Sequence, residues 1–263
     1  MIQKGDIMSA QNPIAVFDSG VGGISVLREL VNILPNEDYI YYGDSKNAPY
    51  GMKDKDTVQA LTIQAAEYLF AQGAKGLVVA CNTATSAGVR ALRERYPDIP
   101  IVGIEPAVKP AVLHKPGGRV LVMATPMTIR EEKFQKLMGQ YTDDAEILPL
   151  PCPGLMDFVE RGDLHSEDFR KYLEELLYEY RKHPVDAAVL GCTHYPFAKD
   201  MIQEILGADV VIFDGGAGTA REMKRRLGEA NLLNLSSNPG KVDFQNSLPD
   251  PNKINLCQWL LNL

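Results

Sequence analysis

Two cysteines occupy equivalent places in two similar stretches of the sequence. Cys81 directly follows the apolar run at residues 76–80, and Cys192 follows the run at residues 187–190 and one glycine. Small polar residues come next in both cases, as at the start of a helix. The positive end of a helix dipole stabilises a thiolate there. A lone cysteine is most often a small buried hydrophobe, but two in equivalent polar contexts predict a pair of reactive thiols.

The other two cysteines, Cys152 and Cys257, lack such surroundings, and we expect them to be packing residues. None of the four cysteines forms a Cys-x-x-Cys pair, which argues against a structural zinc site. Residues 1–10 lack the apolar core and the cleavage site of a secretory signal. We therefore expect a cytoplasmic, reducing location without disulfides, and neither a metal nor a cofactor.

The charge balance argues against two classes of partner. Asp and Glu number 34 against 27 Lys and Arg, so the net charge is −7, and there is no basic block. Sequence-independent nucleic-acid binding needs cations that neutralise phosphates, and an anionic membrane surface would repel this chain. No apolar run approaches the roughly 18 residues that span a bilayer. We expect a small-molecule substrate, no nucleic acid and no membrane, and a homodimer stays open.

Short apolar runs alternate with amphipathic stretches along the chain. Helical spacing of apolar residues is seen, for example, at residues 57–70 and 169–180. The runs lack alternation, which is typical of strands covered on both faces; they lie at residues 14–17, 39–42, 76–80, 101–104, 120–123, 187–190 and 210–213. The alternation predicts an α/β protein with mainly parallel sheets flanked by helices.

A weak internal repeat runs through these elements. Residues 14–19 resemble residues 120–125, and residues 76–83 resemble residues 186–193. Each half thus places a hydroxylated residue at one strand end and a cysteine at another, in the same order. Buried strands followed by small residues are common in α/β proteins, but the cysteine in both halves favours a duplication. Prolines and glycines clustered at residues 104–118 fit a boundary between two similar domains.

Three further features follow predicted strands. The loop at residues 18–23 fails the dinucleotide fingerprint, because Ser25 stands where the third glycine belongs; its backbone N–H groups can still meet a small anion. Asp18 fits a helix cap and a site residue equally well. Turn residues explain the backbone of the loop at residues 44–51, and only its position beside the other strand ends suggests that it contacts a ligand. His194 fits a local acid or base for its neighbouring thiol better than a metal ligand.

Two thiols, one in each half, suit the inversion of a carbon centre. One thiolate removes a proton from one face while the other thiol protonates the opposite face. The developing carbanion needs dense hydrogen bonding and a desolvated site. The residues therefore predict a cofactor-independent racemase or epimerase, and they do not by themselves give its substrate.

The motifs resemble those of the cofactor-independent aspartate/glutamate racemases, over residues 14 to about 225. Cys-Asn-Thr is shared by several members, whereas Gly-Cys-Thr-His-Tyr-Pro together with Asp-Ser-Gly-Val-Gly-Gly is specific to the glutamate enzymes. The matching stretches are residues 15–27, 42–44, 49–51, 80–85 and 190–196. The resemblance implies interconversion of L- and D-glutamate, which supplies D-glutamate for peptidoglycan. A racemase for another amino acid such as aspartate, or for a hydantoin, is the alternative; a binding protein without catalysis is a third hypothesis.

The resemblance also implies roles for particular residues. Cys81 would act on the D-glutamate face with help from Asp18, and Cys192 on the L face with help from His194. Glu160 matches a further site carboxylate, although the local match is looser. The substrate-binding positions implied are Asp18, Ser19, Tyr50, Gly51, Asn82, Thr83, Thr125, Thr128, Thr193 and His194.

The implied fold is two similar α/β domains related by a pseudo-twofold axis, with the active site in the cleft between them. The first would hold residues 1–104 and 214–263, because the chain returns to it at the C-terminus, and the second residues 105–213. The chain departs from the commoner family pattern at residues 44–47, where Asp-Ser-Lys-Asn replaces an Asp-Thr-Ala beginning, and in the glycines of residues 213–219. A longer stretch also precedes the first strand. These departures bear on loop conformation and regulation and leave the reaction unchanged.

Overall fold

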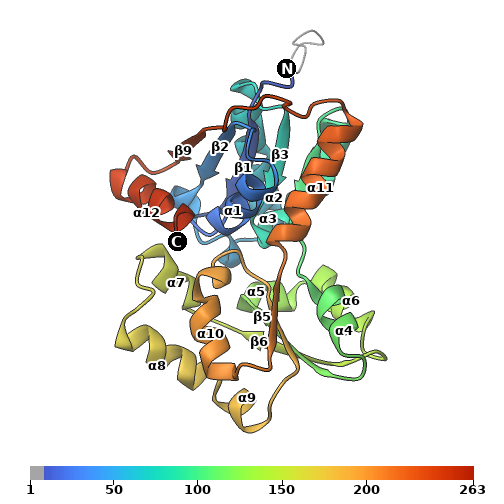
Figure 1. Cartoon of the computed structure of the whole chain (residues 1–263), viewed down its shortest axis with the longest axis vertical. Helices are drawn as coiled ribbons and strands as arrows, with labels where there is room; N and C mark the ends of the chain where they lie inside the picture. The colour runs from blue at the N-terminus through green and yellow to red at the C-terminus, as the bar shows by residue number, and fades with distance from the viewer. Residues whose placement is uncertain (1–8) are drawn as a thin grey trace. The chain divides into compact units, whose positions relative to one another are not determined.

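The computed structural model describes residues 9–263. These divide into two compact units, shown in Figure 1: one holds the residues up to Ile104 together with Gly216–Leu263, and the other is Glu105–Gly215. The chain therefore leaves the first unit once and returns to it. The expected lack of a secretory signal concerned residues 1–10, of which residues 1–8 lie outside the described part.

The first unit is built on a five-stranded parallel sheet. Its strand order is β4-β3-β1-β2-β9. The central strand β1 is buried along its whole length, which explains its unbroken apolar sequence. The strands are β1 (Ile14–Asp18), β2 (Tyr39–Gly43), β3 (Gly76–Val79), β4 (Ile101–Gly103) and β9 (Val242–Asn246).

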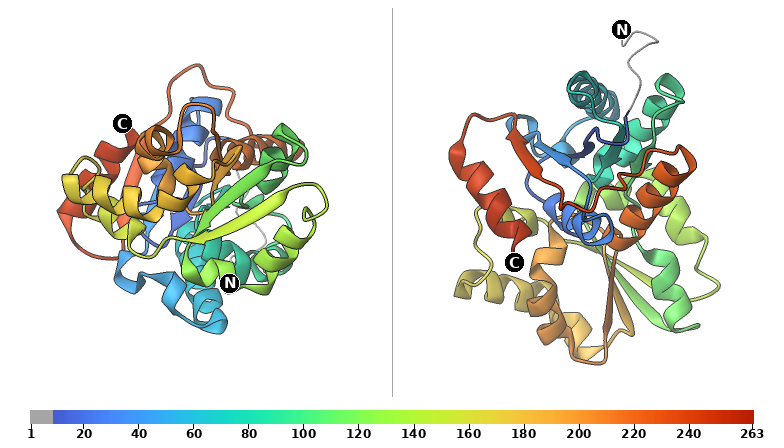
Figure 2. Two further views of the ribbon diagram at one scale, coloured as in Figure 1. Left: turned by 90° about the horizontal axis from the view of Figure 1, so that it is seen from below. Right: turned by 45° about the horizontal axis from the view of Figure 1, so that its top comes forward.

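Helices flank this sheet in two groups. In one group α1 (Ile24–Ile33) packs against α11 (Gly216–Glu229) and α12 (Pro251–Leu261), and in the other α2 (Lys55–Ala71) packs against α3 (Asn82–Arg95). The second group shares a hydrophobic core with β1 and β3. In Figure 2 the last helix, α12, lies beside the edge strand β9, which it also contacts.

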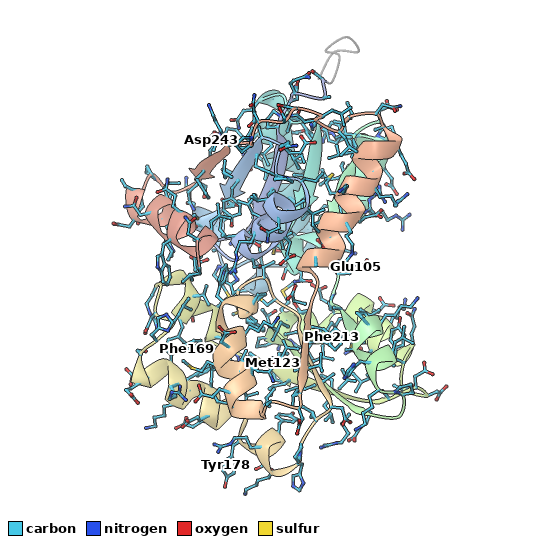
Figure 3. All side chains as sticks on the ribbon, in the orientation of Figure 1. Glu105, Met123, Phe169, Tyr178, Phe213 and Asp243 are labelled. Atoms are coloured by element: carbon cyan, nitrogen blue, oxygen red, sulfur yellow. The ribbon has the colours of Figure 1, made fainter. Side chains whose placement is uncertain are left out.

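The second unit is built on a four-stranded parallel sheet in the order β6-β5-β7-β8. Its strands are β5 (Arg119–Ala124), β6 (Glu146–Pro151), β7 (Ala187–Leu190) and β8 (Val211–Asp214). Figure 3 labels Met123 on β5 and Phe213 on β8. Its helices are α4 (Val108–His114), α5 (Pro126–Arg130), α6 (Glu132–Gly139), α7 (Leu155–Glu160), α8 (Glu167–Leu176), α9 (Tyr178–Lys182) and α10 (Lys199–Leu206).

The two sheets share one topology. The order β4-β3-β1-β2 of the first unit matches the order β8-β7-β5-β6 of the second, and all neighbouring strands are parallel in both. Strand β9 is an addition at the edge of the first sheet. The stretches that repeat in the sequence are β1 and β5 at the centres, and β3 and β7 beside them. The predicted α/β fold with two similar parallel-sheet domains is confirmed.

The expected strands all form, with ends within one residue of those predicted. Two strands were not predicted, β6 and β9, and both lie at sheet edges. The single helix suggested at residues 169–180 is wrong in detail, because the chain forms two helices that separate at Leu177. Within residues 9–263, no helix combines the length and the apolar character needed to cross a membrane.

Candidate active site

In the first unit, Cys81 lies at the carboxyl end of β3 and caps the N-terminus of α3. Its side chain is 7% exposed, and its sulfur accepts a hydrogen bond from the Ala84 N–H at 3.5 Å. The thiol donates to the Ser19 hydroxyl at 3.5 Å. Ser19 follows β1, the neighbour of β3, so the parallel pairing brings these two strand ends together. The fold thus places the thiol among polar hydrogen-bonding partners at the edge where α/β proteins bind ligands.

The glycine-rich loop after β1 folds tightly around Asp18. This side chain is fully buried, and its Oδ1 accepts the Gly20 N–H at 2.8 Å. A Cβ atom at Gly23 would lie 2.6 Å from the Asp18 Cβ, so only glycine fits there. The sequence suggested that the loop N–H groups meet an anion. For Gly20 that anion is the carboxylate of Asp18 itself.

The loop at residues 44–51 is organised by Asp44, which the sequence reasoning did not single out. Asp44 is buried, and its Oδ2 accepts the Tyr50 hydroxyl at 2.7 Å. Its two carboxylate oxygens also accept the Asn47 amide at 3.1 and 3.0 Å. Burial, followed by this bond to Asp44, raises the pKa of Tyr50 well above its ordinary value. Tyr50 therefore stays a neutral phenol, and Gly51 follows it in the same short 3-10 turn.

Asn82 and Thr83 open α3 directly after Cys81. Thr83 is buried. The Asn82 Oδ1 is buried too, and it has no hydrogen-bond partner among the residues that the structure describes. A buried acceptor without a partner costs about 1–3 kcal/mol. A ligand carrying a hydrogen-bond donor would remove that cost, so this amide marks a place where a ligand is expected.

In the second unit, Cys192 begins a chain of three side chains. It follows β7 after Gly191, where a Cβ atom would lie 2.7 Å from the Met123 carbonyl oxygen on β5. The Cys192 sulfur lies 3.6 Å from the His194 Nδ1. The His194 Nε2 in turn lies 2.9 Å from the Glu160 Oε1, at the end of α7. Glu160, which the resemblance named apart from Cys192 and His194, thus joins them.

The electrostatic surroundings of His194 in this group of three side chains favour a protonated imidazole. His194 is 2% exposed, and burial by itself would lower its pKa; the hydrogen bonds to Cys192 and Glu160 nevertheless raise that pKa well above the ordinary value. With Nε2 carrying a proton, the imidazole donates to the Glu160 carboxyl oxygen. The Nδ1 is therefore the ring atom that exchanges a proton with the Cys192 sulfur, as in other sites where an imidazole tunes a thiol.

Three threonines complete the polar ends of β5 and β7. Thr125 follows β5 and caps α5, since its hydroxyl accepts the Thr128 N–H at 3.2 Å. The two hydroxyls of Thr125 and Thr128 lie 2.9 Å apart. Thr128 and Thr193, the latter directly after Cys192, are both buried. The predicted residues of this unit thus gather at the carboxyl ends of two neighbouring strands.

The two remaining cysteines are buried, Cys152 to 2% and Cys257 to 0% exposure. Burial raises the pKa of Cys152 well above its ordinary value, with a further contribution from Cys192. Cys152 is therefore held as a neutral thiol, which suits a packing residue. Over residues 9–263, no cluster of three or more His, Cys, Asp or Glu side chains is arranged to hold a metal ion.

A sequence model of the Asp/Glu/Hydantoin racemase family matches residues 14–223, four-fifths of the chain. The chain belongs to the Asp/Glu/Hydantoin racemase family. The match covers the strand ends that carry Cys81 and Cys192. Both thiols and the residues around them therefore lie within the part of the chain that the family model matches.

Members of this family named glutamate racemase are similar to the chain over nearly its whole length. A glutamate racemase from Clostridium perfringens is 52% identical over 251 residues, which are 95% of this chain and 96% of that protein. The structure of the glutamate racemase isoform RacE1 from Bacillus anthracis is 30% identical, with a TM-score of 0.85, covering 97% of this chain and 95% of that one. A glutamate racemase from Francisella tularensis, solved in complex with D-glutamate, is 30% identical over the same shares, with a TM-score of 0.82.

Within this racemase-family chain, each unit assembles its own set of predicted residues. The hydrogen bonds described above join Cys81 to Ser19 in the first unit, and Cys192 through His194 to Glu160 in the second. Asp44 is the residue that was missed. The sequence did hold a signal for it, because Asp44, like Asp18, is an aspartate at the end of a buried strand. In the structure the Asp44 N–H donates to the Asp18 carbonyl at 2.9 Å.

Proposed function

We propose that this protein is a glutamate racemase that interconverts L- and D-glutamate with Cys81 and Cys192 as its two bases and without a cofactor. The observation that carries the proposal is the equivalent position of the two thiols. Each follows the strand at the equivalent place in its sheet, β3 beside β1 in one unit and β7 beside β5 in the other, and the two sheets share one topology. The family and the names of the similar enzymes support glutamate as the substrate.

In the direction from L- to D-glutamate, the Cys192 thiolate takes the α-proton. The C–H bond breaks, its electron pair stays on the α-carbon, and an S–H bond forms at Cys192. The carbanion then takes the proton of the Cys81 thiol on the opposite face, which leaves Cys81 as a thiolate. The reverse direction starts from that thiolate. This route requires both sulfurs to reach one α-carbon from opposite faces.

His194 and Glu160 would set the protonation state of Cys192. An imidazolium at 3.6 Å stabilises the thiolate that accepts the proton, and Glu160 stabilises the imidazolium. On the other side, the thiol of Cys81 is held by Ser19, and Asp18 would assist it. The α-proton of an amino acid is very weakly acidic, so both bases need such preorganised partners.

Glutamate would be held through hydrogen bonds from residues at or near strand ends. In the first unit the substrate-binding residues would be Asp18, Ser19, Tyr50, Gly51, Asn82 and Thr83, and in the second Thr125, Thr128, Thr193 and His194. The unpaired Asn82 Oδ1 can accept from an ammonium group, which an amino acid supplies. The product D-glutamate would serve peptidoglycan synthesis in the cytoplasm. We expect a small-molecule substrate and no nucleic-acid partner, and a homodimer stays open.

The function is tested by circular dichroism of purified protein incubated with L-glutamate and, separately, with D-glutamate, without added cofactor. Both reactions should converge on a racemic mixture. Cys81→Ser and Cys192→Ser should each keep the fold and substrate binding and lose racemisation by orders of magnitude. Full activity in either variant would overturn the two-thiol mechanism.

A racemase for aspartate or for a hydantoin is the second candidate, because the family includes such enzymes by its description. A panel of L-glutamate, L-aspartate and a 5-substituted hydantoin, assayed at equal concentration, separates the candidates. Glutamate should turn over fastest. Faster turnover of aspartate or of the hydantoin would replace glutamate in the proposal.

A further inference from the structure

The loop at residues 44–51 has two buried ends and a more exposed middle. Asp44 and Tyr50 are buried and bonded to each other, whereas residues 45–49 are half-buried or exposed. Inside the loop, the Asn47 N–H donates to the Asp44 carbonyl at 3.1 Å. These local bonds fix the shape of the turn, but they do not tie its middle to the body of the unit. A contact from another segment of the chain holds the middle of the loop to the unit.

That contact comes from the end of β9, some two hundred residues further along the chain. The Asn246 amide donates to the Ser45 hydroxyl at 2.9 Å, and the Ser247 hydroxyl accepts the Lys46 N–H at 2.9 Å. The Ser247 N–H donates to the Gly43 carbonyl at 2.9 Å, which continues the pairing of β9 with β2. Figure 3 labels Asp243 on the same strand.

Ser247 also acts on the aromatic residues beside the loop. Burial raises the pKa of Tyr42, and the Ser247 side chain lowers that pKa in part. The centroid of the Tyr42 ring lies 6.2 Å from that of Phe17. The Phe17 ring in turn lies 6.1 Å from that of Tyr50. The Ser247 hydroxyl therefore holds the backbone of the loop on the side where Tyr42, Phe17 and Tyr50 contact one another.

We propose that Asn246 and Ser247 are positioning residues that hold the loop at residues 44–51 in its substrate-binding conformation. The proposal rests on the proposed racemase function, in which Tyr50 and Gly51 bind the substrate. Ser45 and Lys46, which receive the two contacts, lie in the stretch where this chain departs from the commoner family sequence. The Lys46 contact is made by its backbone N–H, so it does not depend on the side chain at that position. The two contacts give the added strand β9 a role in substrate binding.

The test is Ser247→Ala, with Ser247→Thr as the conservative variant and Ser236→Ala as the matched control. Ser236 also lies in the C-terminal segment and accepts one backbone N–H, that of Asn238 at 3.1 Å, away from the loop. Loss of one neutral hydrogen bond is worth about a threefold to tenfold change in an equilibrium. Ser247→Ala should raise KM for both enantiomers by about that factor and change kcat less than about twofold. Ser247→Thr and Ser236→Ala should match the wild type.

A second readout is amide hydrogen exchange at Lys46 without substrate, which should become faster in Ser247→Ala alone. Unchanged KM and exchange would overturn the proposal. A drop in kcat together with a large loss of thermal stability would also overturn it, since it would show a merely structural role. If the wild type does not racemise glutamate, the proposed function fails, while the exchange at Lys46 still decides whether Ser247 holds the loop.

Discussion

Glu160→Gln tests the role of the carboxylate that holds His194. The exchange keeps an acceptor near the His194 Nε2, 2.9 Å from the present carboxylate oxygen, and removes its negative charge. A hydrogen bond to a charged group is worth about 1.5–3 kcal/mol and a neutral one about 0.5–1.5 kcal/mol. The difference between the midpoints of these ranges, about 1.2 kcal/mol, is nearly tenfold in the population of the protonated His194 imidazole. We expect kcat/KM to fall by about tenfold in both directions.

The same substitution should change the pH profile in a defined sense. The imidazolium of His194 is present below its pKa in the folded protein, which the bonds to Cys192 and Glu160 raise against the effect of burial. As the pH rises through that pKa, the imidazolium and its support of the Cys192 thiolate are lost. Without Glu160 the pKa is lower, so the alkaline fall in kcat/KM should begin at a lower pH.

Initial rates by circular dichroism with each enantiomer, across the neutral and alkaline range, measure both effects. Glu204→Gln is the matched control, because Glu204 is a carboxylate of the same unit that forms an exposed ion pair with Arg170. That variant should match the wild type. Superposition of the Glu160→Gln profile on that of the wild type would refute the role given to the His194–Glu160 pair.

Two further substitutions test the first unit. Asn82→Ala removes the buried acceptor that lacks a partner; we expect the free energy of unfolding by urea to stay the same or rise by up to about 1 kcal/mol, while KM for glutamate rises about tenfold. An unchanged KM would remove Asn82 from the substrate contacts. Gly23→Ala places a Cβ atom 2.6 Å from that of Asp18, and such overpacking should cost about 1–3 kcal/mol by thermal unfolding. Gly218→Ala, where the added Cβ meets nothing within 4 Å, is the control and should be neutral or stabilising.

The central strands could be predicted because a strand that is buried on both faces has an unbroken run of apolar residues. Strand β1 is buried at every residue, and its apolar run is unbroken. The edge strands carry no such signal. Strand β6 contains Pro149 and Pro151, which an edge strand tolerates because the missing N–H groups are not needed by a second neighbour. Strand β9 is only half-buried and mostly polar, so its sequence resembles a loop.

The site could be predicted as far as it depends on strand ends. Cys81 and Cys192 follow recognisable strands, and parallel pairing then places their neighbours. Contacts between segments distant in sequence could not be derived in that way. Family resemblance named His194 and Glu160 as site residues, but nothing in the sequence indicated that the two pair. The contact of Ser247 with Lys46 joins residues 201 positions apart, and nothing in either sequence segment indicates it.

The central claim, that two separate thiols act on opposite faces of the α-carbon, is tested most directly by racemisation of L-glutamate in heavy water, followed to early conversion. In this account both thiols exchange with solvent between turnovers, whereas within one turnover the proton removed by Cys192 stays on that sulfur. The account predicts that the first D-glutamate carries deuterium at the α-carbon while the remaining L-glutamate carries almost none. D-Glutamate that retains the original protium would show a single base moving the proton across, and would contradict the account.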